Sequence, residues 1–228
     1  MSDCPFDTCD GGGFVYDLDT NTAYDCRCRS QRVARARARS LSAVVPRMYR
    51  DVAFDRPPVT DIEPTIVAQT RRFVNEIDHQ LDAGNGLWFM GPTGTGKTTL
   101  AMLVSKMALE AGHSVAIYSL PKLLAHIRRT YDSEPGGDSY LAFFERLTSV
   151  DLLHIDDLGA EKRSDWVLEQ LYALINERYE AQRSVLVTTN LPHEELEEQI
   201  GSRTVSRLSQ ICDEVPLFGD DRRYGKVA

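Results

Sequence analysis

The apolar residues of this chain follow two spacings that alternate along most of its length. Short, mainly apolar runs occupy 87–90, 113–118, 150–157, 184–190 and 215–218. Apolar residues recur every three or four positions over 66–81, 97–111, 121–127, 140–147 and 164–179. Continuous runs are typical of strands buried on both faces of a parallel sheet, and the wider spacing is typical of helices. The alternation therefore predicts an α/β fold with a parallel sheet between helices.

The first of these strands leads into the glycine-rich segment Gly91–Thr98, which has the form G-x-x-x-x-G-K-[ST]. Its glycines allow the backbone to turn its N–H groups inward around a phosphate, and the helix that opens at Lys97 adds a positive dipole end. We expect Lys97 to reach the β- and γ-phosphates of ATP and the Thr98 hydroxyl to hold Mg²⁺. A glycine-rich turn without a ligand is the alternative, but the flanking strand and helix favour a nucleotide site. The expected binding residues are Gly91, Pro92, Thr93, Gly94, Thr95, Gly96, Lys97, Thr98 and Thr99.

Two carboxylates, Asp156 and Asp157, end the strand predicted over 150–157. Mg²⁺ at a phosphate-binding loop needs a carboxylate from a neighbouring strand, so Asp156 is the expected metal ligand and a further nucleotide-site residue. Asp157 is then the expected general base, which polarises the attacking water directly or through a second water. A solvated strand end is the alternative. His154, within the strand, is expected to be a core residue rather than a ligand.

Two later segments offer further polar groups for the reaction. Asn190 ends the strand over 184–190, where it can orient water near the γ-phosphate, although asparagine is also a common turn former. Arg203 and Arg207 are four residues apart and therefore share one helical face. An arginine supplied from outside a site stabilises charge on the γ-phosphate. The alternative is a surface salt bridge with a glutamate at 194, 195, 197 or 198.

Composition narrows the class of protein. The hydrophobic content of 42% and the charged content of 26% are typical of globular proteins. No apolar run approaches the length of a membrane span, and the first residues lack the pattern of a signal peptide, so we expect a cytoplasmic protein without membrane contact. The net charge of −8 means that any contact with nucleic acid must be local.

Four of the five cysteines, Cys4, Cys9, Cys26 and Cys28, lie near the start of the chain. Between the pairs, an alternating segment and a turn over 14–21 predict a β-hairpin. Two cysteine pairs joined by a hairpin offer the four thiolates of a structural Zn²⁺ site, and the metal would supply folding energy that so small a module lacks. Free thiols or a disulfide are the alternatives, because the spacings Cys-x4-Cys and Cys-x-Cys are not the usual ones. Cys212 is expected to be a small buried residue.

An arginine-rich stretch follows the cysteines, with arginines at 27, 29, 32, 35, 37 and 39. Their spacing distributes them around a helix, which suits DNA phosphates or an acidic partner as well as it suits a solvated linker. The expected domains are a cysteine module over 1–30, an arginine-rich helix and linker over 31–60, and an ATPase domain over 61–228.

Four motifs together resemble one family. Gly91–Thr98, His154-Ile-Asp-Asp-Leu-Gly-Ala-Glu161, Thr188-Thr-Asn-Leu191 and Arg203-x-x-x-Arg207-Leu look like the DnaC/DnaI/IstB branch of AAA+ ATPases. The segment Arg47–Phe54 is similar to the one that precedes this domain in bacterial helicase loaders, and their N-terminal region also binds zinc.

The resemblance implies an AAA+ core whose five parallel strands have the order 5-1-4-3-2. It implies that Asp156 and Asp157 are the Walker B pair, Asn190 is sensor 1 and Arg207 is the arginine finger. It also implies that Arg222 or Arg223 is the candidate for sensor 2. Most AAA+ proteins have Glu where Asp157 stands, which suggests slow hydrolysis and a switch rather than a motor. Only 38 residues follow Asn190, too few for the usual helical lid.

By this resemblance, we expect an ATP-dependent loader that places a DnaB-type hexameric helicase on single-stranded DNA. The cysteine module would hold the helicase, and Lys122, Arg128 and Arg129 would contact the DNA. Self-assembly into a ring or spiral would bring Arg207 of one subunit to the nucleotide of the next. Two rivals remain open: a transposition helper of the IstB type, and a helicase-binding scaffold or inhibitor that does not hydrolyse ATP.

Overall fold

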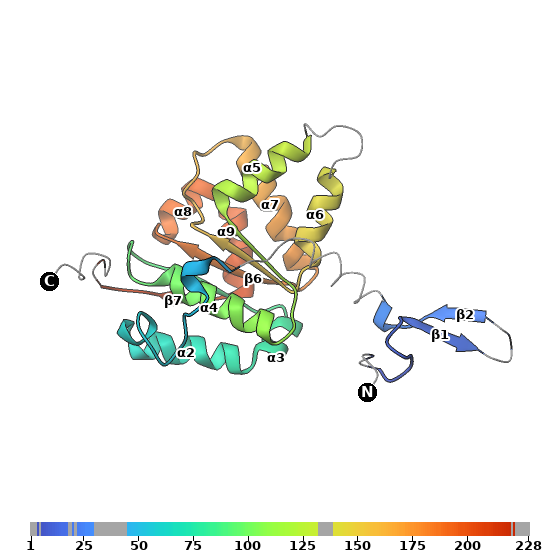
Figure 1. The fold of residues 1–228 in the computed structure, drawn as a ribbon. Helices are drawn as coiled ribbons and strands as arrows, with labels where there is room; N and C mark the ends of the chain where they lie inside the picture. The colour runs from blue at the N-terminus through green and yellow to red at the C-terminus, as the bar shows by residue number, and fades with distance from the viewer. Residues whose placement is uncertain are drawn as a thin grey trace.

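The computed structural model describes residues 4, 6–17, 20, 22–29, 45–131, 139–219 and 221 (Figure 1). From residue 45 onward, these residues form a three-layer α/β domain in which one sheet lies between two groups of helices. In the described part of the chain, none of the helices is apolar over the length that crossing a membrane requires.

All five strands of the sheet run parallel. They are β3 (Gly86–Met90), β4 (Val115–Ser119), β5 (Leu152–Asp156), β6 (Ser184–Thr189) and β7 (Cys212–Pro216). Their spatial order is β4-β5-β6-β3-β7. Numbered from β3, this is 5-1-4-3-2, so the predicted sheet is confirmed. Because β3 pairs with β6, and β6 with β5, the carboxyl ends of these three strands meet at one edge.

Helices cover both faces of the sheet (Figure 1). One layer contains α2 (Pro64–Asn75), α3 (Ile77–Asp82) and α4 (Lys97–Glu110), which follow the short 3₁₀ turns η1 (Arg47–Tyr49) and η2 (Val59–Asp61). The other contains α5 (Leu120–Tyr131), α6 (Tyr140–Ser149), α7 (Asp165–Glu180), α8 (His193–Ile200) and α9 (Ser202–Ile211). Alternate residues of β3 point to opposite faces of the sheet. Leu87 and Phe89 pack with α4, whereas Trp88 packs with α7 and α9.

Some predicted boundaries differ from the observed ones. The strand predicted over 215–218 begins at Cys212, because the buried Cys212 and Val215 face the core while Asp213 and Glu214 are exposed at the sheet edge. The helix predicted over 66–81 is two helices, which break at Glu76. The Ser164 side chain caps α7 by accepting a hydrogen bond from the Val167 amide, as predicted.

Residues 45–60 pack onto the domain rather than crossing solvent. Val52 and Val59 are buried in the core formed with α2 and α4, and the Lys106 ammonium donates to the Val52 carbonyl at 3.1 Å. The arginine-rich helix predicted to precede them lies mostly outside the described residues.

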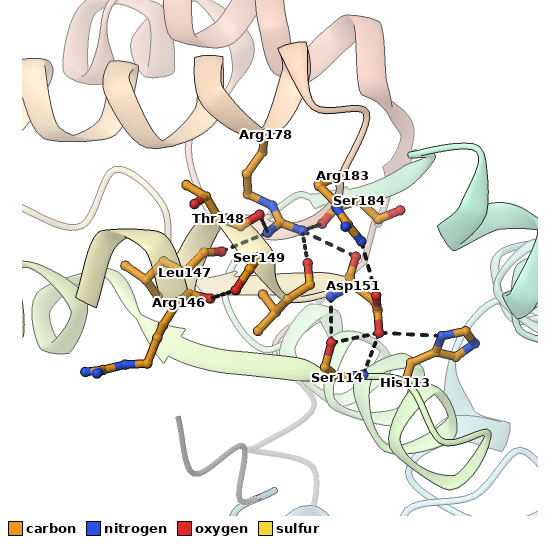
Figure 2. Close-up of polar contacts among 11 residues, drawn as sticks. His113, Ser114, Arg146, Leu147, Thr148, Ser149, Asp151, Arg178, Arg183 and Ser184 are labelled. Carbon is orange, nitrogen blue, oxygen red and sulfur yellow. Dashed lines mark hydrogen bonds and ion pairs between the residues drawn. The ribbon is translucent and has the colours of Figure 1, made fainter. Parts of the chain in front are cut away.

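At the amino edge of the sheet, the fully buried guanidinium of Arg178 binds carbonyl oxygens from three segments (Figure 2). It donates to Leu147 at 2.8 Å, to Val150 at 3.0 Å and to Ser184 at 2.6 Å, with longer contacts to Thr148 and Asp151. Arg178 therefore joins the end of α6 to the starts of β5 and β6. Burial lowers the pKa of Arg178 to about 9, which still leaves it charged at neutral pH.

A separate two-stranded sheet lies near the N-terminus. Strands β1 (Phe14–Asp17) and β2 (Thr22–Asp25) pair antiparallel, with Phe14 opposite Asp25, and form the predicted hairpin.

Candidate nucleotide site and cysteine cluster

The glycine-rich loop connects β3 to α4 at the carboxyl edge of the sheet. The angle φ is +138° at Gly91, +81° at Gly94 and +106° at Gly96, where α4 begins. The Lys97 side chain is almost fully buried, and its ammonium donates to the carbonyls of Gly91 at 2.8 Å and Pro92 at 2.7 Å. The Thr95 hydroxyl also donates to Pro92, at 2.9 Å. The loop thus curls around the Lys97 ammonium at the start of α4.

Three residues that sequence reasoning missed pack against this loop. A Cβ at Gly91 would lie 2.0 Å from the Leu217 carbonyl, and one at Gly96 would lie 2.5 Å from the Ile62 side chain. A Cβ at Gly94 would lie 1.9 Å from a carboxylate oxygen of Asp221. No side chain larger than hydrogen fits at Gly91, because backbone atoms of the segment after β7 occupy that space.

The carboxylate of Asp156 is the centre of a hydroxyl-rich cluster at the end of β5. Its Oδ1 accepts hydrogen bonds from the Thr98 hydroxyl at 3.0 Å and from the Thr188 hydroxyl at 2.7 Å. The structure therefore brings together Thr98 and Asp156, the two side chains expected to hold Mg²⁺. One carboxylate and one hydroxyl beside a phosphate-binding loop suit Mg²⁺, which prefers oxygen ligands and retains several waters.

Asp157 has a backbone conformation that is uncommon for a residue with a side chain, with φ at +58°. Its amide donates to the Thr188 hydroxyl at 2.9 Å, and the next amide, of Leu158, donates to the Thr188 carbonyl at 2.7 Å. Thr188 thus fixes the position of both aspartates, a role that sequence reasoning did not assign. The available signal was the threonine pair Thr188-Thr189 at the end of a strand whose three preceding residues are apolar.

Asn190 is exposed and lies one residue beyond the end of β6. The preceding residue, Thr189, is buried and donates its hydroxyl to the Leu158 carbonyl at 2.7 Å. The β6 end is therefore tied to the turn that follows β5, which places Asn190 at the same edge as Asp157.

His154 is fully buried behind this cluster. Its Nδ1 is 2.9 Å from the Ser105 hydroxyl on α4, and its Nε2 is 3.9 Å from Asp156 Oδ1. Burial lowers the pKa of His154 to about 3, so the imidazole is neutral. The prediction that His154 is a core residue is confirmed.

Arg207 lies on α9, in the helical layer that does not contain α4. Its guanidinium stacks over the Tyr179 ring at 4.3 Å, and its Nε donates to Asn176 Oδ1 at 3.3 Å. Arg203 is exposed on the same helix. The structure thus leaves Arg207 on the outer surface of the α7–α9 layer. Arg222 and Arg223 lie outside the described residues.

The basic side chains of α5 are exposed. Arg128 stacks over Trp166 at 4.6 Å, Arg129 lies 3.5 Å from His126, and Lys122 occupies the first turn. The helix contains no Asp or Glu, although the whole chain has a net charge of −8. This surface is therefore locally basic.

The four N-terminal cysteines converge, although they come from different segments. Their sulfur atoms all lie within 4.8 Å of one another, with 3.8 Å between Cys4 and Cys26 and 3.6 Å between Cys9 and Cys28. These separations are far above the 2.05 Å of a disulfide and close to the ~3.8 Å edge of a tetrahedron with Zn–S bonds of ~2.3 Å. The residues present therefore fit a four-thiolate zinc site.

The pKa values of these thiols are consistent with a cation-binding site. Burial opposes ionisation of Cys4, but hydrogen bonds from the backbone of Phe6, Thr8 and Cys9 outweigh it and lower the Cys4 pKa to about 5. Burial beside the other sulfurs raises the pKa of Cys28 to about 12. A bound cation would offset the repulsion between neighbouring thiolates and stabilise all four of them.

Comparison with known proteins assigns the chain to a family. The model of the IstB-like ATP binding protein family matches residues 27–225, which include the glycine-rich loop, both aspartates and α9. The chain belongs to the IstB-like ATP-binding family. The expected resemblance is confirmed, and with it the assignment to a family of ATP-binding proteins.

Curated relatives of this IstB-like protein include two kinds of protein. The replicative helicase loader DnaC of Escherichia coli strain K12 is 27% identical over 142 residues, or 62% of this chain and 56% of the relative. DnaC of Buchnera aphidicola subsp. Acyrthosiphon pisum is 24% identical over 165 residues, or 71% and 64%. The insertion sequence ATP-binding protein y4pL of Sinorhizobium fredii is 30% identical over 149 residues, or 63% and 58%. The chain thus spans 56% to 64% of the length of these three relatives.

Solved structures share the fold of this IstB-like protein. The DnaC helicase loader has a TM-score of 0.66 and 24% identity, covering 75% of this chain and 99% of that one. DnaI has a TM-score of 0.58 and 20% identity, covering 72% and 92%. The replication initiator DnaA bound to AMPPCP and single-stranded DNA has a TM-score of 0.60 and 18% identity, covering 75% and 51%. The AAA+ fold is therefore confirmed.

Proposed function

We propose that this protein binds ATP and Mg²⁺ at the loop between β3 and α4 and hydrolyses the nucleotide slowly. The arrangement of Thr98, Asp156 and Thr188 carries the proposal, because it places a hydroxyl and a carboxylate together beside the phosphate-binding loop. The ammonium of Lys97 would bind the β- and γ-phosphates. When bound, Mg²⁺ would supply charge neutralisation at the phosphates.

In this proposal, Asp157 is the general base for the attacking water, and Asn190 orients that water. Thr188 holds the backbone of Asp157 and the carboxylate of Asp156, so it positions the base relative to the metal ligand. Aspartate is one methylene shorter than the usual glutamate, which favours water-mediated contact and slow turnover. Slow turnover suits a switch whose ATP state lasts long enough to govern an assembly.

The Arg207 side chain would complete the site of a neighbouring copy. Its position on the outer surface of the α7–α9 layer supports action between subunits rather than within one. ATP would then favour assembly, because the finger of one subunit stabilises charge at the γ-phosphate of the next. Hydrolysis would release the assembly.

We further propose that the protein loads a DnaB-type hexameric helicase onto single-stranded DNA. DnaC relatives and the cysteine cluster support this proposal, as does the basic surface of α5 at Lys122, Arg128 and Arg129. The N-terminal module, with Zn²⁺ on Cys4, Cys9, Cys26 and Cys28, would hold the helicase. The AAA+ domain would contact the DNA backbone.

The test is a pull-down of the cognate hexameric helicase with the full chain and with a chain lacking residues 1–44. Residues 45–60 are retained because Val52 and Val59 belong to the core. We expect the full chain to capture the helicase and to promote its unwinding of closed circular single-stranded DNA with an annealed strand. Loss of capture without residues 1–44 would locate the helicase contact in those residues. Absence of capture by the full chain would contradict the proposal that the protein loads a helicase.

A transposition helper of the IstB type is the second candidate. The family name and the 30% identity to an insertion sequence ATP-binding protein favour it. The family match begins at residue 27, so it excludes three of the four clustered cysteines. Capture of a transposase, with no binding to the helicase, would favour this function. A scaffold without turnover is distinguished by phosphate release, since it would bind ATP and release no phosphate.

A further inference from the structure

The guanidinium of Arg207 is held in a fixed orientation by two side chains of α7. Tyr179 provides the ring on which it stacks, and Asn176 accepts a hydrogen bond from its Nε. Among the described residues, the terminal nitrogens of Arg207 make no hydrogen bond, and only its Nε donates. They are therefore available as a pair of donors.

Each of the two supports is itself held by a further side chain. The Asn176 amide nitrogen donates to Glu180 at 2.9 Å, which turns the Asn176 oxygen toward Arg207. The Tyr179 hydroxyl donates to Gln210 at 2.8 Å, and the Gln210 amide donates to the Ser206 carbonyl at 3.1 Å. The ring is thus anchored to α9, the helix that carries Arg207.

The surface beside Arg207 is hollowed and polar. A hollow of about 460 Å³ is lined by Tyr172, Glu197, Ser202, Arg203, Ser206 and Arg207. Its one carboxylate, Glu197, lies 3.6 Å from His193, whereas two arginines face the space. An anionic group of another molecule can therefore approach Arg207 from this side.

We propose that Tyr179 and Asn176 are positioning residues, which present Arg207 as a pre-oriented two-donor fork to the γ-phosphate held by a second copy of this chain. The inference rests on the proposed composite ATP site and adds the residues that hold the finger. A stacked guanidinium has already lost much of its conformational freedom, so binding phosphate oxygens costs it less entropy. We expect this saving to lower the activation free energy of hydrolysis. A cation–π contact at a partly exposed position corresponds to about a two- to fivefold effect on rate.

The experiment mixes two full-length variants in the presence of ATP, Mg²⁺ and oligo-dT. The donor subunit has Lys97→Ala, so it lacks a working phosphate loop and keeps Arg207. The acceptor subunit has Arg207→Ala, so it keeps the loop and lacks the finger. We expect each variant alone to be inactive and the mixture to hydrolyse ATP at the interfaces where an acceptor loop meets a donor finger.

Tyr179→Leu is then added to one subunit at a time. In the donor it is expected to lower kcat of the mixture about two- to fivefold, with KM for ATP unchanged. In the acceptor it is expected to change nothing, because that subunit has no finger to position. Tyr179→Phe in the donor keeps the stacked ring and loses only the hydroxyl contact to Gln210, so it is expected to keep a higher rate than Tyr179→Leu. An equal loss from either subunit, or no loss from the donor, overturns the inference.

Asn176→Ala, at a half-exposed position, provides a second variant that leaves the core intact. It is expected to reproduce the donor-specific loss, and a symmetric or absent effect counts against the inference in the same way. Failure of the two parent variants to restore activity on mixing overturns the composite site itself. Restored activity that is insensitive to Tyr179 and Asn176 in the donor overturns only the positioning role.

Discussion

Replacing Arg178 by methionine tests whether the buried guanidinium holds the amino edge of the sheet together. The Arg178→Met side chain fills a similar volume and donates no hydrogen bond. Three carbonyls that now accept short bonds, those of Leu147, Val150 and Ser184, would lose their donor. Each of these carbonyls would remain in a region that water does not easily reach.

The magnitude follows from these contacts. A hydrogen bond from a charged donor contributes about 1.5–3 kcal/mol, so three short ones set an upper range of about 5–9 kcal/mol. Contributions from neighbouring contacts are not additive, and methionine regains some apolar packing. We therefore expect Arg178→Met to lower the free energy of unfolding by about 3–5 kcal/mol, the usual result of leaving a buried polar group without its charged partner. For a domain of this size, the midpoint of thermal unfolding would fall by about 6–20 °C.

Urea unfolding followed by the fluorescence of Trp88 and Trp166 measures this change, because both tryptophans lie in the main domain. Arg183→Met is the matched control. Arg183 contacts Asp151 at 3.2 Å in the same network, but its side chain is 39% exposed. Its loss is expected to cost less than about 1 kcal/mol. Equal effects of the two substitutions would refute the reasoning, since burial and the number of bonds would then not decide the cost.

Three other substitutions test the site and the module. Asp157→Asn keeps a side chain that tolerates a positive φ, so ATP binding is expected to persist while phosphate release falls about a hundredfold or more; hydrolysis that survives would exclude Asp157 as the base. His154 has a folded pKa of about 3, below the ordinary 6.5, so the unfolded chain binds the extra proton and stability is lost as pH falls below 6.5. This group lowers the free energy of unfolding by about 2 kcal/mol by pH 5. His154→Leu is therefore expected to reduce the difference between the free energies of unfolding at pH 7 and pH 5, measured by urea titration, by that amount. An unchanged difference contradicts a neutral buried imidazole. Cys28→Ser is expected to abolish binding of about one zinc per chain in metal analysis, whereas Cys212→Ala keeps it; absence of zinc from the parent chain removes the metal site.

Sequence patterns predicted the sheet and the phosphate loop because both depend on local spacing. The run Leu87–Met90 and the glycines after it specify a strand, a loop and a helix without reference to distant residues. The strand order came from the resemblance to a family rather than from the pattern itself. The acidic pair Asp213-Glu214 concealed the start of β7, because an edge strand exposes side chains that a buried strand does not.

Long-range contacts explain what the sequence left unassigned. Thr188 positions Asp156 and Asp157 only because β5 and β6 pair in one particular register. Arg178 was detectable in principle, since it continues the buried spacing of Leu171, Leu174 and Ile175 along α7. Its partners come from α6, β5 and β6, and no sequence pattern specifies which carbonyls converge there.

The amino edge of the sheet contributes stability, whereas the carboxyl edge contains the nucleotide site. Arg178 secures the amino edge, whereas the phosphate loop and the aspartates occupy the carboxyl edge, about five residues or ~17 Å away along the strands. Substitutions that silence the chemistry therefore leave the main anchor of the fold in place. We therefore expect copies with a silenced site to keep the fold, and with it the surface at Arg207 through which copies of this chain are proposed to assemble.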